Sequence, residues 1–133
     1  MSSNENVKTA RSYLAALEAG VAGQALAAFF DPDVVQTEFP NRLLPAGAVR
    51  NLDALLAAAE RGKLAVQNQR YEVRHVVAEG DFVALEVDWS ATSKVPFGQT
   101  PAGAVLRAAF AVFLQFREGR VIAQRNYDCF RDL

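Results

Sequence analysis

Apolar residues in the first half of the chain recur three or four positions apart, the spacing of one helix face. The pattern predicts a helix over residues 6–20, ending at a glycine. A shorter helix is predicted over residues 23–30, because the Asp-Pro-Asp sequence at 31–33 cannot continue it. A third is predicted over residues 51–61, with Gly62 as its C-cap.

The second half of the chain alternates apolar and polar residues, which is typical of strands with one buried face. Strands are predicted over the segments 69–77, 82–92, 105–116 and 121–130, after an early short strand at 34–39. A loop from Ser93 to Gly103 separates the middle two of the long strands. In the first of them, alternation places Tyr71, Val73, His75 and Val77 on one side.

Three helices followed by consecutive strands predict an α+β domain with a mainly antiparallel sheet. The length of 133 residues fits one domain, which we expect to span residues 1–133. Apolar residues make up 51% of the chain and charged residues 22%, the balance of a globular protein rather than a disordered one.

Charge and cysteine content exclude several classes of function. Fourteen Lys and Arg stand against fifteen Asp and Glu, which gives no electrostatic basis for binding nucleic acid or an anionic membrane. One cysteine and one histidine form neither an internal disulfide nor a zinc cluster. The polar N-terminus does not read as a signal peptide, and the apolar stretch 105–116 is too short to span a bilayer. We therefore expect a cytoplasmic protein that binds no metal.

Four segments of the chain resemble the nuclear transport factor two-like superfamily, the last two its SnoaL-like polyketide cyclase branch. They are Tyr13–Gly20 (YLAALEAG), Phe29–Val34 (FFDPDV), Pro96–Gly103 (PFGQTPAG) and Phe113–Ile122 (FLQFREGRVI). The resemblance implies a cone: a strongly curved sheet wrapped around the three helices, with an internal pocket for a small apolar molecule. It also implies a homodimer through the outer face of the sheet. The superfamily contains several enzymes and many members without known catalysis, so the fold alone does not give the function.

Two candidate catalytic residues follow from the similarity to ketosteroid isomerases within this superfamily. Tyr13 matches their tyrosine that donates to a developing oxyanion, and Glu38 falls where they have an aspartate general base. The alternatives are a core tyrosine whose hydroxyl reaches solvent and an exposed acid on an edge strand. Val112 stands at the position of the protonated aspartate that completes their oxyanion site, and valine cannot donate.

Asp128 is the third candidate catalytic residue, because SnoaL-like cyclases carry an acid/base aspartate near the end of the last strand. Alternation places Gln124, Asn126 and Asp128 on one face of that strand. The cyclases often have histidine or tryptophan directly before the aspartate, where this chain has Tyr127. The alternative is a structural ion pair between Asp128 and Arg125 or Arg131.

The remaining predicted pocket residues are mostly apolar. We expect Asn126 and Gln124 deeper on the wall that carries Asp128. The other predicted lining residues are Trp89, Phe110, Val112, Phe39 and Arg107. Arg107 is also the arginine nearest to an epoxide-hydrolase-like set with Asp128, Asn126 and Tyr13, although its strand has no second aspartate.

These expectations combine into one leading hypothesis and two alternatives. The leading hypothesis is a cofactor-independent isomerase or cyclase-like enzyme, in which Asp128 or Glu38 moves a proton on a small carbonyl or polyketide-like compound. Tyr13, with Asn126, holds the developing enolate oxygen. The alternatives are a non-catalytic ligand-binding or assembly module and an epoxide hydrolase or dehydratase-like lyase.

Overall fold

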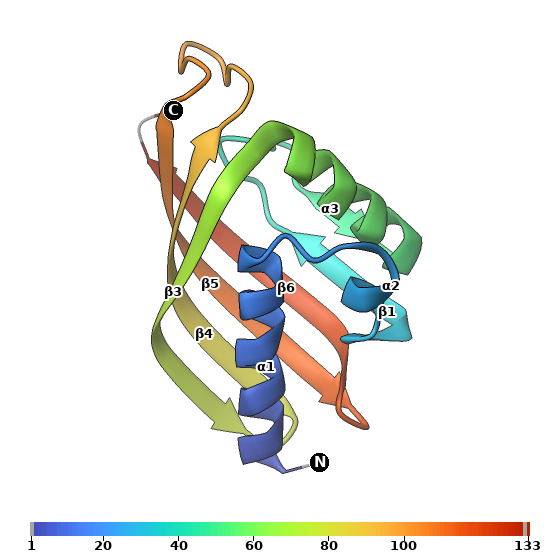
Figure 1. Cartoon of the computed structure of the whole chain (residues 1–133). Coiled ribbons are helices and arrows are strands. Elements are labelled where there is room, and N and C mark those ends of the chain that lie inside the picture. Colours follow the sequence, from blue (N-terminus) through green and yellow to red (C-terminus); the bar gives the residue numbers. More distant parts are fainter. Residues whose placement is uncertain (1, 132) are drawn as a thin grey trace.

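A computed structural model describes residues 2–131 and 133 of the chain and has an α+β architecture (Figure 1). Its elements in chain order are α1 (Ser3–Glu18), α2 (Gly23–Ala27), β1 (Phe30–Glu38), β2 (Ala48–Arg50), α3 (Leu52–Ala65), β3 (Val66–Glu79), β4 (Phe82–Ser93), β5 (Val105–Arg117) and β6 (Arg120–Arg131). The strands form one sheet in the order β2-β1-β6-β5-β4-β3. Four of its five strand pairings are antiparallel, and β1 runs parallel to β6. The predicted fold class is therefore confirmed.

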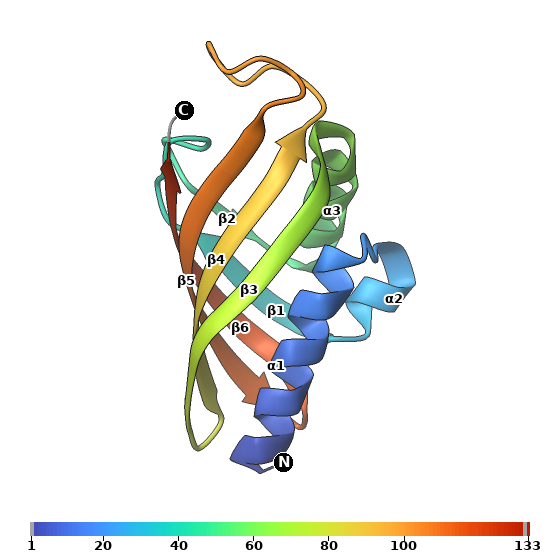
Figure 2. The ribbon, with the colours of Figure 1, turned by 60° about the vertical axis from the view of Figure 1, so that its left-hand side comes forward.

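The sheet is strongly curved, and the three helices lie against its concave side (Figure 2). Helix α1 packs on β3 and β4, whereas α3 packs on β1, β2 and β3. Consecutive strands β3 to β6 form hairpins, so the long alternating segments of the sequence lie side by side in order. This arrangement leaves space between α1, α3 and the inner face of the sheet.

Local sequence signals explain where the helices begin. Ser2 is the N-cap of α1, and its hydroxyl oxygen accepts a hydrogen bond from the backbone N–H of Glu5 at 3.1 Å. Asn51 does the same for α3, accepting from the backbone N–H of Ala54 at 2.9 Å. Gly20 follows α1 with a φ of 77°, the left-handed conformation that ends a helix.

The core is built from the alternating residues of β4 and β5. Their inward-facing side chains are Val83, Leu85, Val87, Trp89 and Ala91 on β4, and Leu106, Ala108, Phe110, Val112, Leu114 and Phe116 on β5, all buried. Ala10, Tyr13 and Leu14 of α1 pack against this layer from the helical side. Alternation predicted these two strands within one residue of their observed bounds at most ends.

Several details of the fold differ from prediction. Helix α2 ends at Ala27, and β1 begins at Phe30 rather than at residue 34. Helix α3 continues through Gly62 to Ala65, because Gly62 does not adopt the left-handed conformation of a C-cap. The three-residue strand β2 was not predicted, because it is too short to show alternation. In β3 the pairing with β4 shifts between Val73 and His75, so His75 and Val77 point outward rather than sharing the face of Tyr71.

No helix within residues 2–131 is both long and apolar enough to cross a membrane.

Gly47 holds the turn between β1 and β2 in a conformation that only glycine fits. Its φ is 66°, and a Cβ atom there would lie 2.6 Å from the backbone oxygen of Glu38. We predict that Gly47→Ala destabilises the protein by roughly 1–2 kcal/mol from the left-handed conformation, plus about 1–3 kcal/mol from the clash. The free energy of unfolding in urea measures this loss.

Gly98→Ala is the matched control, because Gly98 has a φ of 56° but nothing within 4 Å of its Cβ position. It should show only the smaller, conformational loss. Equal losses in the two variants would contradict the predicted clash with β1.

Candidate functional site

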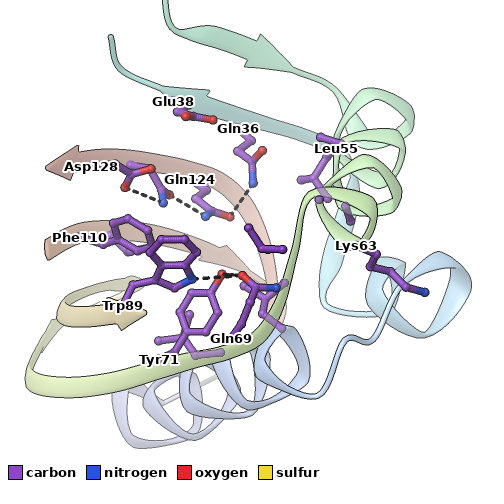
Figure 3. Close-up of a pocket in the computed structure, with 18 of the residues that line it drawn as sticks. Gln36, Glu38, Leu55, Lys63, Gln69, Tyr71, Trp89, Phe110, Gln124 and Asp128 are labelled. Carbon is purple, nitrogen blue, oxygen red and sulfur yellow. Dashed lines mark hydrogen bonds between the residues drawn. The ribbon is translucent and has the colours of Figure 1, made fainter. Parts of the chain in front are cut away.

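A cavity of about 360 Å³ lies between the helices and the concave face of the sheet. Side chains from α1, α3 and all six strands line it. Figure 3 shows two different walls: polar side chains of β1 and β6 on one, and aromatic side chains of β3, β4 and β5 on the other. Leu55 of α3 faces these walls from the helical side, whereas the Lys63 side chain at the rim points away from them. The cavity therefore combines an apolar surface with a concentrated set of polar groups.

The polar wall is organised by a chain of hydrogen bonds along β6. The Tyr13 hydroxyl donates to Gln124 Oε1 at 3.0 Å, and Gln124 Nε2 donates to Asn126 Oδ1 at 2.7 Å. Asn126 Nδ2 then donates to Asp128 Oδ1 at 3.3 Å. Each donor in the chain points toward Asp128, so the buried tyrosine of α1 is linked to the carboxylate through two amides.

A second set of polar contacts holds Glu38 beside Asp128. Arg50 NH2 forms an ion pair with Glu38 Oε1 at 3.1 Å, and both side chains are about four-fifths buried. Asn41 Nδ2 donates to the other carboxylate oxygen of Glu38 at 2.8 Å. Arg50 NH1 also donates to Gln36 Oε1, and Gln36 Nε2 donates to Gln124 Oε1. The two sets of contacts therefore meet at Gln124.

The aromatic wall is a packed cluster. Trp89 and Phe110 stack with ring centroids 5.4 Å apart, and Phe130 meets both of them edge-on at 5.7 Å. The indole N–H of Trp89 and the hydroxyl of Tyr71 both donate to Gln69 Oε1, at 3.1 and 3.2 Å. These bonds satisfy the polar atoms of the two rings, so the surface offered to a ligand is apolar.

The cavity shifts the pKa of Asp128 toward neutral pH. Desolvation by burial, together with the negative charge of Glu38, raises its pKa from 3.8 to about 6. The hydrogen bond from Asn126 and the positive charge of Arg50 act in the opposite direction but are weaker. Asp128 can therefore exchange a proton close to neutral pH.

The two tyrosines of the cavity stay protonated at any physiological pH. Burial raises the pKa of Tyr13 to about 12, although its hydrogen bond to Gln124 opposes the shift. Burial also raises the pKa of Tyr71 above its usual range. Both hydroxyls are consequently hydrogen-bond donors and not bases.

Most of the side chains that the sequence singled out meet at this one cavity. Its lining includes the three candidate catalytic residues and five of the candidate pocket residues: Tyr13, Glu38, Asp128, Gln124, Asn126, Trp89, Phe110 and Val112. The Tyr13 hydroxyl is bonded to Gln124 and does not reach solvent. Glu38 is partly buried, and its strand is flanked by β2 and β6. Asp128 accepts from Asn126 on the face of β6 opposite Arg125.

Phe39 and Arg107 lie outside the cavity, contrary to prediction. Phe39 stacks on Tyr127 at 4.5 Å on the outer face of the sheet, because the inward positions of β1 are Gln36 and Glu38. Arg107 lines a separate hollow on the same outer face, because Leu106 and Ala108 are the buried neighbours on β5. Strand alternation separates both side chains from Asp128.

Arg50, which forms the ion pair with Glu38, is not among the predicted site residues. Arg50 belongs to the short strand β2 and immediately precedes the N-cap of α3, so neither alternation nor a motif marks it. Gln36 and Gln69 were likewise not singled out. A signal for Gln36 was available, because it lies two residues before Glu38 and so shares its strand face.

Within the part of the chain that the structure describes, no group of three or more His, Cys, Asp or Glu side chains is placed to hold a metal ion.

Solved structures with the same fold come from several bacteria. A putative hydroxylase from Streptomyces galilaeus, AclR, superposes with a TM-score of 0.81 at 21% identity, over 98% of this chain and 82% of that one. A putative polyketide cyclase from Streptomyces antibioticus, IdmH, gives a TM-score of 0.78 at 20% identity, over 92% and 91% of the two chains. An NTF2-like protein from Burkholderia xenovorans gives 0.75 at 21% identity, over 96% and 92%. At these identities the likeness establishes the fold.

A comparison with curated protein sequences finds no significant match. The family model of the SnoaL-like domain matches residues 10–124, which cover both walls of the cavity except Asn126, Asp128 and Phe130 of β6. The chain therefore belongs to the SnoaL-like domain family.

Proposed function

We propose that the protein is a cofactor-independent proton-transfer enzyme, of the isomerase or cyclase type, that acts on a small apolar carbonyl compound. The proposal rests on Asp128. This carboxyl group lines the cavity beside the aromatic wall, and its pKa is raised to about 6. A general base works best when its pKa is near the working pH, and Asp128 meets this requirement.

The neighbouring ion pair assigns different tasks to the two carboxylates. Arg50 and Asn41 both contact Glu38, so the negative charge of Glu38 is held in place by two donors. Asp128 has a single weak donor, Asn126 at 3.3 Å, and feels the charge of Glu38. Asp128 is accordingly the group that takes and returns the proton, and Glu38 is the fixed anion that keeps it basic.

The proton leaves the carbon next to the substrate carbonyl as that carbon–hydrogen bond breaks. The electron pair moves into the carbonyl, so that an enolate oxygen develops negative charge. Asn126 is the proposed donor to this oxygen, because its amide has a second N–H beyond the one given to Asp128. Tyr13 acts behind it: its one hydroxyl proton is given to Gln124, which orients Asn126. In a substrate with a carbon–carbon double bond next to the acidic carbon, the enolate extends over that bond. The carbonyl then reforms as the electron pair moves to the far carbon, which takes the proton back from Asp128, so that the double bond has shifted and the substrate is isomerised.

The aromatic wall supplies the proposed binding surface for the substrate. Trp89, Phe110 and Phe130 offer ring faces and edges and no free donor, which favours a flat, apolar ring system. The similarity to a putative polyketide cyclase supports a polyketide-like compound as the substrate.

The raised pKa of Asp128 has a consequence for stability. Between pH 3.8 and about pH 6 the folded state binds more protons than the unfolded state, so stability falls as the pH rises through this range. We predict that Asp128→Asn is more stable than the wild type at pH 8, by roughly 1–3 kcal/mol, and gains little at pH 4. Urea unfolding at the two pH values measures the difference.

Asp81→Asn is the control for that comparison, because Asp81 is an exposed residue in the turn between β3 and β4. It should show no pH-dependent gain. A stability gain of Asp128→Asn that is equal at pH 4 and pH 8 would contradict the assigned pKa.

A direct test of the proposed reaction needs no knowledge of the natural substrate. Incubation of a panel of cyclic and polycyclic ketones with the protein in D₂O, followed by NMR, detects exchange of the hydrogens next to the carbonyl. We predict exchange that Asp128→Asn reduces at least 100-fold, the usual contribution of a general base. Glu38→Gln should retain exchange. The pH at which the exchange rate falls off on the acid side should be lower in this variant, because the negative charge that raises the pKa of Asp128 is removed.

Glu60→Gln, an exposed change on α3, is the control and should leave both rate and pH profile unchanged. Binding of a ketone with no exchange in the wild type would overturn the proposed catalysis and favour the ligand-binding module. Exchange that survives in Asp128→Asn would assign the base to another residue.

We also propose that the protein forms a homodimer through the outer face of the sheet. Phe39, Phe113 and Tyr127 form a continuous aromatic cluster on that face, with ring centroids 4.5 and 5.7 Å apart. Tyr127 is 43% exposed, and Val35, which faces the same side of β1 as Phe39, is 49% exposed. An apolar patch of this kind is typical of a surface that another protein covers.

Val35→Lys is predicted to weaken the dimer at least tenfold, because it places a charge in the proposed contact. Leu64→Lys is the control, since Leu64 is an apolar residue with 71% exposure on α3, on the concave side of the sheet. Sedimentation velocity over a range of concentrations measures both variants. A monomeric wild type, or equal effects of the two substitutions, would contradict the proposed interface.

A further inference from the structure

A second hollow, of about 230 Å³, lies on the outer face of the sheet, away from the cavity that holds Asp128. Its charged and hydroxyl side chains come from four strands: Arg70, Glu72, Asp88, Ser90, Arg107 and Arg131. Nothing in the proposed proton transfer uses these residues. The hollow therefore needs an explanation of its own.

The three arginines stand in one row across the sheet. Arg70 pairs in register with Ser90 of β4, Ser90 with Arg107 of β5, and Arg107 with Arg131 of β6. Neighbouring strands are about 4.8 Å apart, so the row spans roughly 14 Å. Ser90 is the one small side chain in it, which leaves a gap between the flanking guanidinium groups. A bulky residue at that position would fill the hollow.

The row is electrostatically unfavourable without a counter-charge. Arg107 and Arg131 are directly opposite each other on adjacent strands, and like charges in that position destabilise a sheet. Of the two acids in the hollow, Asp88 is bound by Arg74 at 2.7 Å. Among residues 2–131 and 133, none of the three arginines forms an ion pair within 4 Å. The hollow thus carries an excess of positive charge.

We propose that this hollow is a binding site for a phosphate group, carried by a small phosphorylated molecule. Guanidinium groups bind phosphate oxygens in pairs, and three of them on separate strands can approach a tetrahedral anion from different sides. The Ser90 hydroxyl lies in the same row and can donate to a further oxygen. A planar carboxylate presents two oxygens and would leave part of this donor set unused.

The site is separate from both functions proposed above. It opens on the opposite face of the sheet from Asp128. Arg107 also lies six residues before Phe113 on β5, about 20 Å along the strand from the aromatic cluster of the proposed dimer. Failure of the phosphate site would consequently leave the proton-transfer proposal untouched.

The test is titration calorimetry of the full chain with inorganic phosphate and with pyrophosphate at low ionic strength, with acetate as the planar comparison. Phosphate is expected to bind and acetate to bind at least tenfold more weakly. Arg107→Gln should weaken phosphate binding about tenfold, the effect of losing one charge-assisted hydrogen bond to the anion. Arg131→Gln is the second variant and should show a similar loss.

Arg61→Gln is the matched control and should bind like the wild type, because Arg61 is an exposed arginine of α3, which lies on the concave side of the sheet, away from the row.

Three results would overturn the proposal. One is a wild type that does not bind phosphate or pyrophosphate. Another is an equal loss of phosphate affinity in Arg107→Gln and Arg61→Gln, which would mean that the affinity depends only on the net charge of the protein. The third is dissociation of a dimer by Arg107→Gln with phosphate affinity unchanged, measured by sedimentation, which would assign the row to contact between two copies of the chain.

Discussion

Burial of three consecutive inward-facing polar side chains on β6 is the constraint around which the cavity is built. Gln124, Asn126 and Asp128 face the interior of a sheet whose neighbouring strand, β5, presents only apolar residues there. A buried polar group without a partner costs a few kcal/mol, so each of the three needs a hydrogen-bond partner. Asn126 and Asp128 accept from the preceding amide on their own strand, whereas Gln124 accepts from Tyr13 of α1 and Gln36 of β1, which thereby tie the helix and the parallel strand to β6.

The parts of this arrangement that could be predicted are those with a period in the sequence. Alternation predicts which residues share a face: Trp89 with the apolar residues of β4, and Asp128 with Gln124 and Asn126 on β6. The family resemblance predicts that the face of Asp128 is the one turned to the cavity, where these three side chains and Trp89 lie. Strand alternation also predicts the correct face of the sheet for Phe39 and Arg107. Both had been assigned to the pocket by residue type and family resemblance, and strand alternation sends both to the outer face.

The parts that could not be predicted depend on contacts between segments far apart in the sequence. Arg50 meets Glu38 because the turn at Gly47 folds β2 back onto β1, and a three-residue strand carries no periodic signal. The shift of pairing at His75 depends on how β3 follows the curvature of β4, which neither strand shows alone. The sequence therefore indicates that Glu38 and Asp128 share a cavity. It does not indicate that an arginine, Arg50, forms an ion pair with Glu38.

That distinction is what turns two nearby carboxylates into a potential site of proton transfer. Two equivalent acids in an apolar cavity would share one proton, and neither would have a defined role. Arg50 contacts one of them, and the other is left with a single amide donor at 3.3 Å. The asymmetry has two sources: the donors Arg50 of β2 and Asn41 of the turn before it, which both contact Glu38, and the burial of Asp128 against the long strands. A small edge strand and its turn thus bind one carboxylate, whereas the long strands desolvate the other and raise its pKa.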